Sequence, residues 1–177
     1  AMIDVQSSQD QRNVAIDRVG VKDVVYPIRL RTPDGGEQTT VATINMYVAL
    51  PHYKKGTHMS RFLEVLNAET SEPLTPERIP KVTSAICERL NAEKAHFSCT
   101  FTYFIKKPAP VTGTPGLMDY EVTFVGKVDK GEYTFRMTVV VPVTSLCPCS
   151  KKISDYGAHN QRSHVTISTV TEGFVWI

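Results

Sequence analysis

Two cysteines and one histidine near the end of the chain are the residues whose types and spacing could do chemistry. Cys147 and Cys149 flank a proline after an apolar run, and His159 follows Cys147 after eleven intervening residues. Thiolate sulfur and imidazole nitrogen suit zinc and related metals, and catalytic sites typically have three protein ligands and one open position. The Cys147-Pro148-Cys149 spacing is tighter than the knuckle of a structural zinc finger. We therefore interpret one thiol as a ligand and the other as a reactive group.

The same residues also have an interpretation without a metal. A cysteine at a strand end is often a small buried apolar residue, and a lone histidine is usually hydrogen-bonded or at the surface. The surrounding segment, 145–163, is rich in polar residues that could bind an anion, including Lys151 and Arg162. That composition favours a functional loop.

The overall composition indicates the class of ligand. The chain of 177 residues has 20 lysines and arginines against 18 acidic residues, a formal net charge of +2. Its dense cations are only separated pairs, whereas a nucleic-acid binder usually carries a concentrated basic face. A small polyanion therefore fits better than a nucleic acid.

The cysteines and the apolar runs indicate the compartment. The 4 cysteines show no regular framework, no signal-peptide pattern is visible, and no apolar run approaches the ~18 residues of a membrane helix. We expect a cytoplasmic protein with no membrane span.

Hydrophobic periodicity predicts the elements that position these residues. Alternating apolar residues predict a hairpin over about 20–50 and further strands over 97–105, 120–124, 133–143 and 164–170. A first helix begins near Thr57, with Met59, Phe62, Leu63 and Leu66 on its apolar face. A second helix runs to about Asn91, starting either at Pro76 after a Thr75 cap or at Pro80, with Ile79, Val82, Ile86 and Leu90 buried. Cys87 and Cys99 are expected in the core.

This order of elements predicts an α+β fold with an antiparallel sheet and two helices on one face. His58 and Arg61 lie at the start of the first helix, where free backbone N–H groups favour anions. The alternative is that they only cap the helix and carry surface charge. The apolar run Phe174–Ile177 would leave an exposed face, so we expect the natural chain to continue.

Three motifs resemble the type IB GTP cyclohydrolase I family. They are Asp4-Val5-Gln6, the segment from Gly56 to Phe62, and the segment from Ser145 to Arg162 that contains Cys-Pro-Cys and Tyr-Gly-Ala-His-Asn-Gln-Arg. The last motif is long and specific, and together the motifs span nearly all of the chain.

The resemblance implies a tunnelling fold, in which tandem modules of strands and helices assemble into a barrel. It implies a homotetramer with sites at the subunit interfaces. On this basis we expect an arm at 1–19, a first module at 20–144, the metal and active-site loop at 145–163, and the start of a second module at 164–177.

The implied reaction converts GTP and water to 7,8-dihydroneopterin triphosphate and formate, the first step of folate biosynthesis. By resemblance, Cys147 and His159 match ligands of a divalent metal, which could be zinc, manganese or iron, and both take part in catalysis. Cys149 would be the neighbouring thiol that moves protons. His58, Arg61, Lys151 and Arg162 would hold the triphosphate. A carboxylate ligand and the guanine anchor are expected beyond this sequence.

Three alternatives remain open at this point. A nitrile reductase of queuosine synthesis has the same fold but needs no metal, and an archaeal-type cyclohydrolase would give a cyclic phosphate. The third is a non-catalytic module in which zinc only joins strands.

Overall fold

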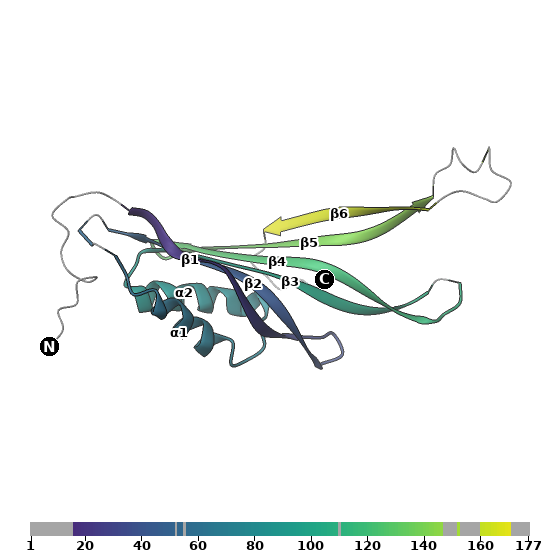
Figure 1. The fold of residues 1–177 in the computed structure, drawn as a ribbon, viewed down its shortest axis with the longest axis horizontal. Helices are drawn as coiled ribbons and strands as arrows, with labels where there is room; N and C mark the ends of the chain where they lie inside the picture. The colour runs from purple at the N-terminus through teal and green to yellow at the C-terminus, as the bar shows by residue number, and fades with distance from the viewer. Residues whose placement is uncertain are drawn as a thin grey trace.

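The computed structural model describes residues 16–51, 53–54, 56–109, 111–146, 152 and 160–170. In these ranges six strands form one antiparallel sheet in the order β1-β2-β3-β4-β5-β6, so each strand lies beside its neighbours in sequence (Figure 1). The strands are β1 Ile16–Arg31, β2 Glu37–Leu50, β3 Lys94–Pro108, β4 Pro115–Asp129, β5 Glu132–Leu146 and β6 Asn160–Val170.

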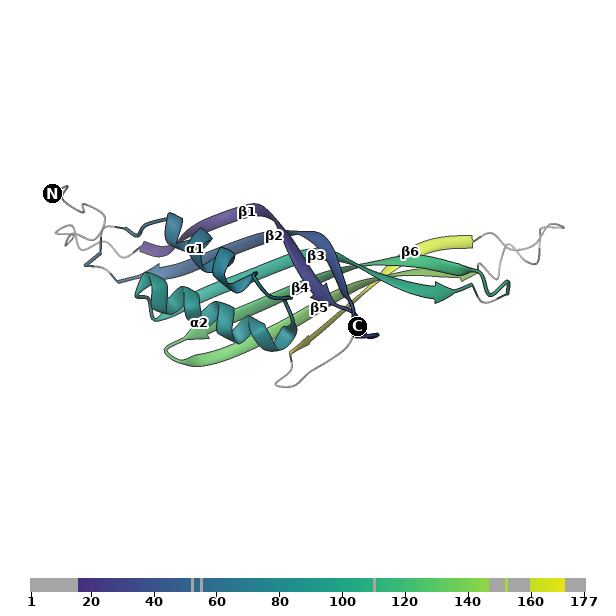
Figure 2. The ribbon, with the colours of Figure 1, turned by 90° about the horizontal axis from the view of Figure 1, so that it is seen from below.

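Two helices between β2 and β3 cover one face of this sheet (Figures 1 and 2). They are α1, Ser60–Glu69, and α2, Ile79–Leu90, which follows the short 3-10 helix η1, Pro76–Arg78. Arg89 of α2 forms an ion pair with Glu64 of α1, so the two helices also contact each other. The predicted α+β fold is confirmed. Assembly of tandem modules into a barrel stays a prediction.

The core lies between the helices and the covered face of the sheet. Alternate residues of the strands point into it because side chains of a strand alternate between its two faces. The four predicted apolar residues of α2 are buried, and Cys99 is fully buried, as expected. Cys87 is partly buried and packs against the core. The strand residues in the core include Ile28, Leu30, Ile44, Met46, Val48, Phe97, Phe101, Val122, Phe124, Phe135 and Met137.

A glycine lets α2 approach the sheet closely. A Cβ atom on Gly126 of β4 would lie 2.5 Å from Thr83 Oγ1 and 2.7 Å from the Cγ2 atom of Ile79. Thr83 is fully buried, and its hydroxyl donates to the Ile79 carbonyl at 2.7 Å, so its polar atom is satisfied within the helix. The absence of a side chain at position 126 therefore sets the distance between helix and sheet.

The start of α2 combines the two predicted starts. Thr75 is extended and Pro76 opens η1, while Pro80 lies in the first turn of α2 itself. The helix ends at Asn91, which has a φ of 50° and adopts the left-handed conformation common after a helix.

The predicted apolar face of α1 is partly wrong. The helix begins at Ser60 rather than near Thr57, and it buries Phe62, Val65 and Leu66. Met59 and Leu63 are 38% and 43% exposed. The stripe is rotated because α1 packs against α2 as well as the sheet, so Val65 faces the groove that also contains Ala85.

Two strands extend beyond their predicted bounds. β1 begins at Ile16, which pairs with Leu50, although residues 1–19 were expected to form an arm. β6 begins at Asn160, paired with Leu146, rather than at His164. In both places pairing with a neighbouring strand recruits residues that show little apolar alternation. β6 belongs to the same sheet as β5, and the division into two modules stays a prediction.

Candidate functional site

The candidate site begins where β5 and β6 form a long hairpin. The pairing is continuous from Arg136 and Val170 to Leu146 and Asn160. The segment 147–159 therefore leaves and re-enters the sheet at directly paired residues. Arg162 pairs with Thr144, and both side chains are exposed.

The predicted metal and thiol residues lie in that connecting segment. Cys147, Cys149, Lys151 and His159 are outside the described residues. Among the residues that the structure does describe, no three histidine, cysteine, aspartate or glutamate side chains come together to hold a metal.

The start of α1 carries the other two predicted phosphate ligands. His58 and Arg61 are both partly buried. The Arg61 N–H donates to the His58 carbonyl at 3.1 Å, and the Phe62 N–H donates to the Met59 carbonyl at 3.2 Å. These two N–H groups are already used within the turn. An anion here would therefore depend on the side chains more than on the free backbone groups that we predicted.

His58 and Arg61 lie at the opposite end of the sheet from Arg162. Val48 of β2 pairs with Ala95, Ala95 pairs with Val128, and Val128 pairs with Tyr133. The last residues of β2 and the first residues of β5 therefore lie at the same end of the sheet. At this end Lys54, just before α1, donates from Nζ to the Asn91 carbonyl at 3.0 Å.

The distance between His58 or Arg61 and Arg162 follows from the length of β5. β5 has 15 residues, which at the usual rise per residue place its two ends about 45 Å apart. One chain therefore does not bring His58 and Arg61 together with Arg162, and a site using all three needs more than one chain.

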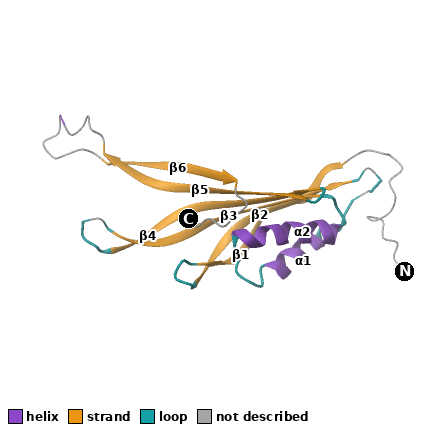
Figure 3. Ribbon diagram, turned by 180° about the vertical axis from the view of Figure 1, so that it is seen from behind, coloured by secondary structure: helices purple, strands orange, loops and turns teal. Residues whose placement is uncertain are grey.

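The far half of β5 is separated from β4. Strands β4 and β5 pair from Asp129 and Glu132 to Glu121 and Val140. Beyond Val140, β5 pairs with β6 alone, and the β5–β6 hairpin diverges from the β3–β4 hairpin (Figure 3). An unpaired strand edge can pair with another strand. The hairpin that leads into 147–159 thus has an edge suited to contact with another chain.

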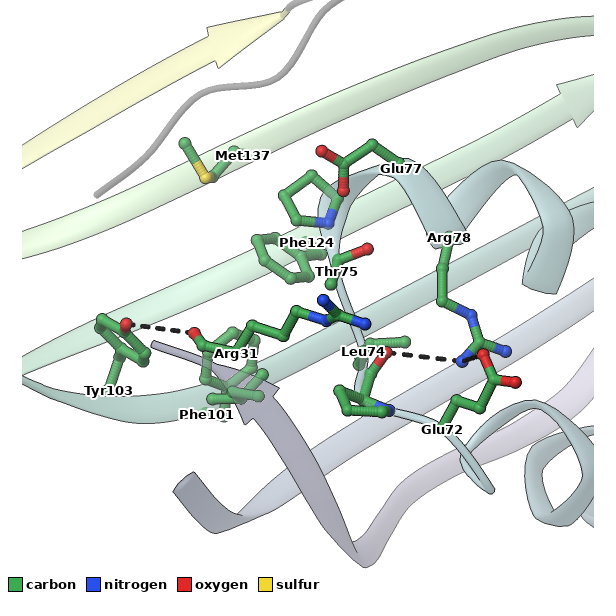
Figure 4. A pocket seen from close by; sticks show the side chains of 13 residues that line it. Arg31, Glu72, Leu74, Thr75, Glu77, Arg78, Phe101, Tyr103, Phe124 and Met137 are labelled. Atoms are coloured by element: carbon green, nitrogen blue, oxygen red, sulfur yellow. Dashed lines mark hydrogen bonds and ion pairs between the residues drawn. The ribbon is translucent and has the colours of Figure 1, made fainter. Parts of the chain in front are cut away.

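A pocket of about 450 Å³ lies between η1 and the covered face of the sheet (Figure 4). Phe101, Phe124 and Met137 form much of its wall. Arg78, at its edge, is held by ion pairs to Glu69 and Glu72. The walls come from elements far apart in the sequence, so periodicity could not predict the pocket. Its apolar lining suits an apolar group rather than a triphosphate.

Burial shifts the acidity of the two described cysteines. It raises the pKa of Cys99 to about 12 and also raises the pKa of Cys87. Both thiols are free, and both stay protonated near neutral pH. Neither has the thiolate character that a nucleophile or metal ligand needs.

In the described part of the chain, no helix is long and apolar enough to cross a membrane.

A family model and individual known proteins all match almost the whole sequence, and they all belong to one family. The family model described as type I GTP cyclohydrolase folE2 matches residues 2–177. A GTP cyclohydrolase FolE2 of Methylobacillus flagellatus is 55% identical over 98% of this chain and 65% of its own length. One of Nitrosomonas eutropha is 56% identical with the same coverage. One of Thiobacillus denitrificans is 56% identical over 99% of this chain and 65% of its own length. The chain thus spans about two thirds of these relatives, or slightly less.

Proposed function

Because the chain belongs to the type I GTP cyclohydrolase FolE2 family, as its motifs indicated, we propose that the protein containing it is a metal-dependent GTP cyclohydrolase I. The enzyme would convert GTP and water to 7,8-dihydroneopterin triphosphate and formate. This reaction is the first step of folate biosynthesis. The observation that carries the proposal is the similarity to proteins named GTP cyclohydrolase over 98% of the chain. Two cysteines and a histidine within the matched region have the chemistry that such a reaction needs.

Cys147 and His159 would hold the divalent metal, which could be zinc, manganese or iron. The pairing of Leu146 with Asn160 supports this assignment, because each proposed ligand is the next residue in the chain beyond a paired residue. Thiolate and imidazole form a suitable donor set for these metals. A metal there would supply Lewis acidity and lower the pKa of a water that attacks C8 of the purine.

Cys149 would act on protons rather than on the metal. Its neighbourhood contains Lys151, whose positive charge would lower the pKa of the thiol and increase its thiolate fraction. A thiol with a pKa near the working pH can accept and return a proton as the imidazole ring of GTP opens. The imidazole carbon C8 then leaves as formate, and the ribose carbons close the new ring.

Charged side chains would hold the triphosphate. Lys151 and Arg162 come from the hairpin, and His58 and Arg61 come from the start of α1. Because Arg162 lies at the opposite end of the sheet from His58 and Arg61, the site would be built between subunits. This supports assembly as a homotetramer, and the open edge of β5 beyond Val140 offers a surface for it.

We also propose that the protein is cytoplasmic and acts on free GTP, with no nucleic-acid partner. The free thiols of Cys87 and Cys99 support a reducing compartment. The separated lysine pairs and the small net charge of +2 support a small anionic substrate.

The proposal is tested by GTP turnover with the complete protein, stripped of metal and then given zinc, manganese or iron. The fluorescent pterin formed after oxidation measures the product. We expect metal-dependent turnover that Cys147→Ala and His159→Ala abolish together with metal binding, and that Cys149→Ala abolishes while metal stays bound. Cys87→Ala is the matched control and keeps both. Tight zinc without turnover in the wild type would overturn the proposal and favour a structural zinc module.

A further inference from the structure

A cationic cluster lies on the helix-free face of the sheet. Tyr47, His96 and Lys127 occupy one row across β2, β3 and β4, because Tyr47 pairs with His96 and His96 pairs with Lys127. Their neighbours Val48, Ala95 and Val128 are buried in the core on the other face. Alternation therefore points this row away from the helices.

The row lines an open pocket of about 590 Å³ at the end of the sheet where β3 begins. Arg18 of β1 lines the same pocket. The rings of Tyr47 and His96 lie with their centroids 5.2 Å apart and their planes tilted by 33°, so they form an aromatic wall. The side chains of Arg18 and Lys127 are exposed at the pocket.

The charges of this pocket are unbalanced. Its lining has Arg18, Lys94 and Lys127 against one carboxylate, Asp129. That carboxylate is already used, since Lys94 Nζ lies 3.4 Å from its Oδ2 atom. Within the described residues, no ion pair or side-chain hydrogen bond is formed by Arg18 or Lys127. Two cations of the pocket therefore have no counter-charge among the residues that the structure describes.

The unbalanced positive charge affects the pKa of His96. Partial burial lowers its pKa, and the positive charges of Lys127 and Arg18 lower it further. The tyrosine on β2 and the Lys94–Asp129 pair complete the polar groups of the pocket. An anion placed between the cations would reverse the unfavourable electrostatics and favour protonation of the imidazole.

We propose that Arg18, His96 and Lys127 form a binding site for a phosphate-bearing anion on the helix-free face of the sheet. Guanidinium and ammonium groups bind phosphate oxygens through charge-assisted hydrogen bonds, and the histidine adds a donor when protonated. The site is distinct from the 147–159 hairpin, which leaves the opposite end of the sheet. The phosphate could belong to the triphosphate of a nucleotide or to a separate small ligand.

The first test is calorimetric titration of the full chain with pyrophosphate, at low ionic strength and near neutral pH. We expect Arg18→Gln and Lys127→Gln each to weaken pyrophosphate binding about tenfold. Lys81→Gln is the matched control, since it removes an exposed lysine from α2, on the other side of the sheet, and leaves binding unchanged. Absence of pyrophosphate binding, or equal weakening by all three variants, would overturn the proposal.

A second experiment measures the pKa of His96 by NMR titration of its imidazole ring signals, which are identified by their loss in His96→Gln. Bound pyrophosphate raises the pKa of His96 if the site is correct, and an unchanged pKa contradicts it even when calorimetry detects binding elsewhere. The source of the phosphate is decided by GTP kinetics of Lys127→Gln. A higher KM with unchanged kcat identifies the substrate's triphosphate, whereas unchanged kinetics identify a separate ligand. The titrations need no turnover, so their result is independent of the proposed activity.

Discussion

Leu146 and Asn160 are directly paired residues of β5 and β6, and the predicted metal ligands Cys147 and His159 lie between them in the sequence. The start of α1, with His58 and Arg61, lies at the other end of the sheet. A site that uses both regions must therefore draw on two chains, and this relationship gives the first prediction.

Arg61→Ala and Arg162→Ala should each abolish most turnover, yet activity should return when the two variants are produced together. In a site built from two subunits, random assembly leaves about a quarter of the sites with both arginines intact. Turnover of the mixed protein, measured against each variant alone, checks this. A mixture as inactive as its components would contradict a shared site.

Gly126→Ala should destabilise the fold by about 1–3 kcal/mol, because the new methyl group would clash with Thr83 and Ile79 of α2. Urea denaturation followed by circular dichroism measures the loss. The matched control is Gly116→Ala on the same strand, where the nearest atom is the Lys107 carbonyl oxygen at 3.5 Å. A loss at position 126 no larger than that at position 116 would show that α2 does not depend on this close approach.

Tyr133→Phe should change the free energy of unfolding by no more than about 0.5 kcal/mol in either direction. Among the described residues, the buried Tyr133 hydroxyl has no hydrogen-bond partner, so removing it loses no bond. Tyr103→Phe provides the contrast, since that hydroxyl donates to the Arg31 carbonyl at 3.2 Å and its loss should cost about 1 kcal/mol. A larger cost at Tyr133 than at Tyr103 would mean that the Tyr133 hydroxyl has a partner after all.

His96 should make the fold less stable as the pH falls below about 6.5. Burial, Lys127 and Arg18 lower its folded pKa below the ordinary value of 6.5, so the unfolded chain binds the proton first and unfolding is favoured at low pH. Denaturant midpoints between pH 7.5 and pH 5 measure this slope. His96→Gln should flatten it, and an identical slope in the variant would contradict the assigned cause.

Much of the fold could be predicted because strand alternation and helical periodicity record burial directly. For this reason periodicity predicts the buried face of α2, with Ile79, Val82, Ile86 and Leu90, correctly. Periodicity does not predict the buried face of α1 correctly, since Val65 turns toward α2 and only tertiary packing decides between it and Leu63. The start of β6 at Asn160 depends on pairing with β5, which leaves little apolar signal in its own sequence.

The candidate site was predicted from residue types and motif resemblance rather than from geometry. Sequence spacing could not reveal that Arg61 and Arg162 lie far apart, because that separation is set by the length and direction of β5. The cluster of Arg18, His96 and Lys127 was missed because its members come from three strands distant in sequence. The polar positions of those alternating strands, aligned across the sheet, are the signal that could have found it.

The most direct test of the proposed activity follows the fate of C8 of the purine. The complete metal-loaded protein is given GTP labelled with carbon-14 at C8, and labelled formate and pterin are measured together. The proposal predicts one labelled formate for each pterin formed, with neither product from Cys147→Ala. The proposal would be contradicted if no labelled formate formed with zinc, manganese or iron, or if the label stayed in the pterin.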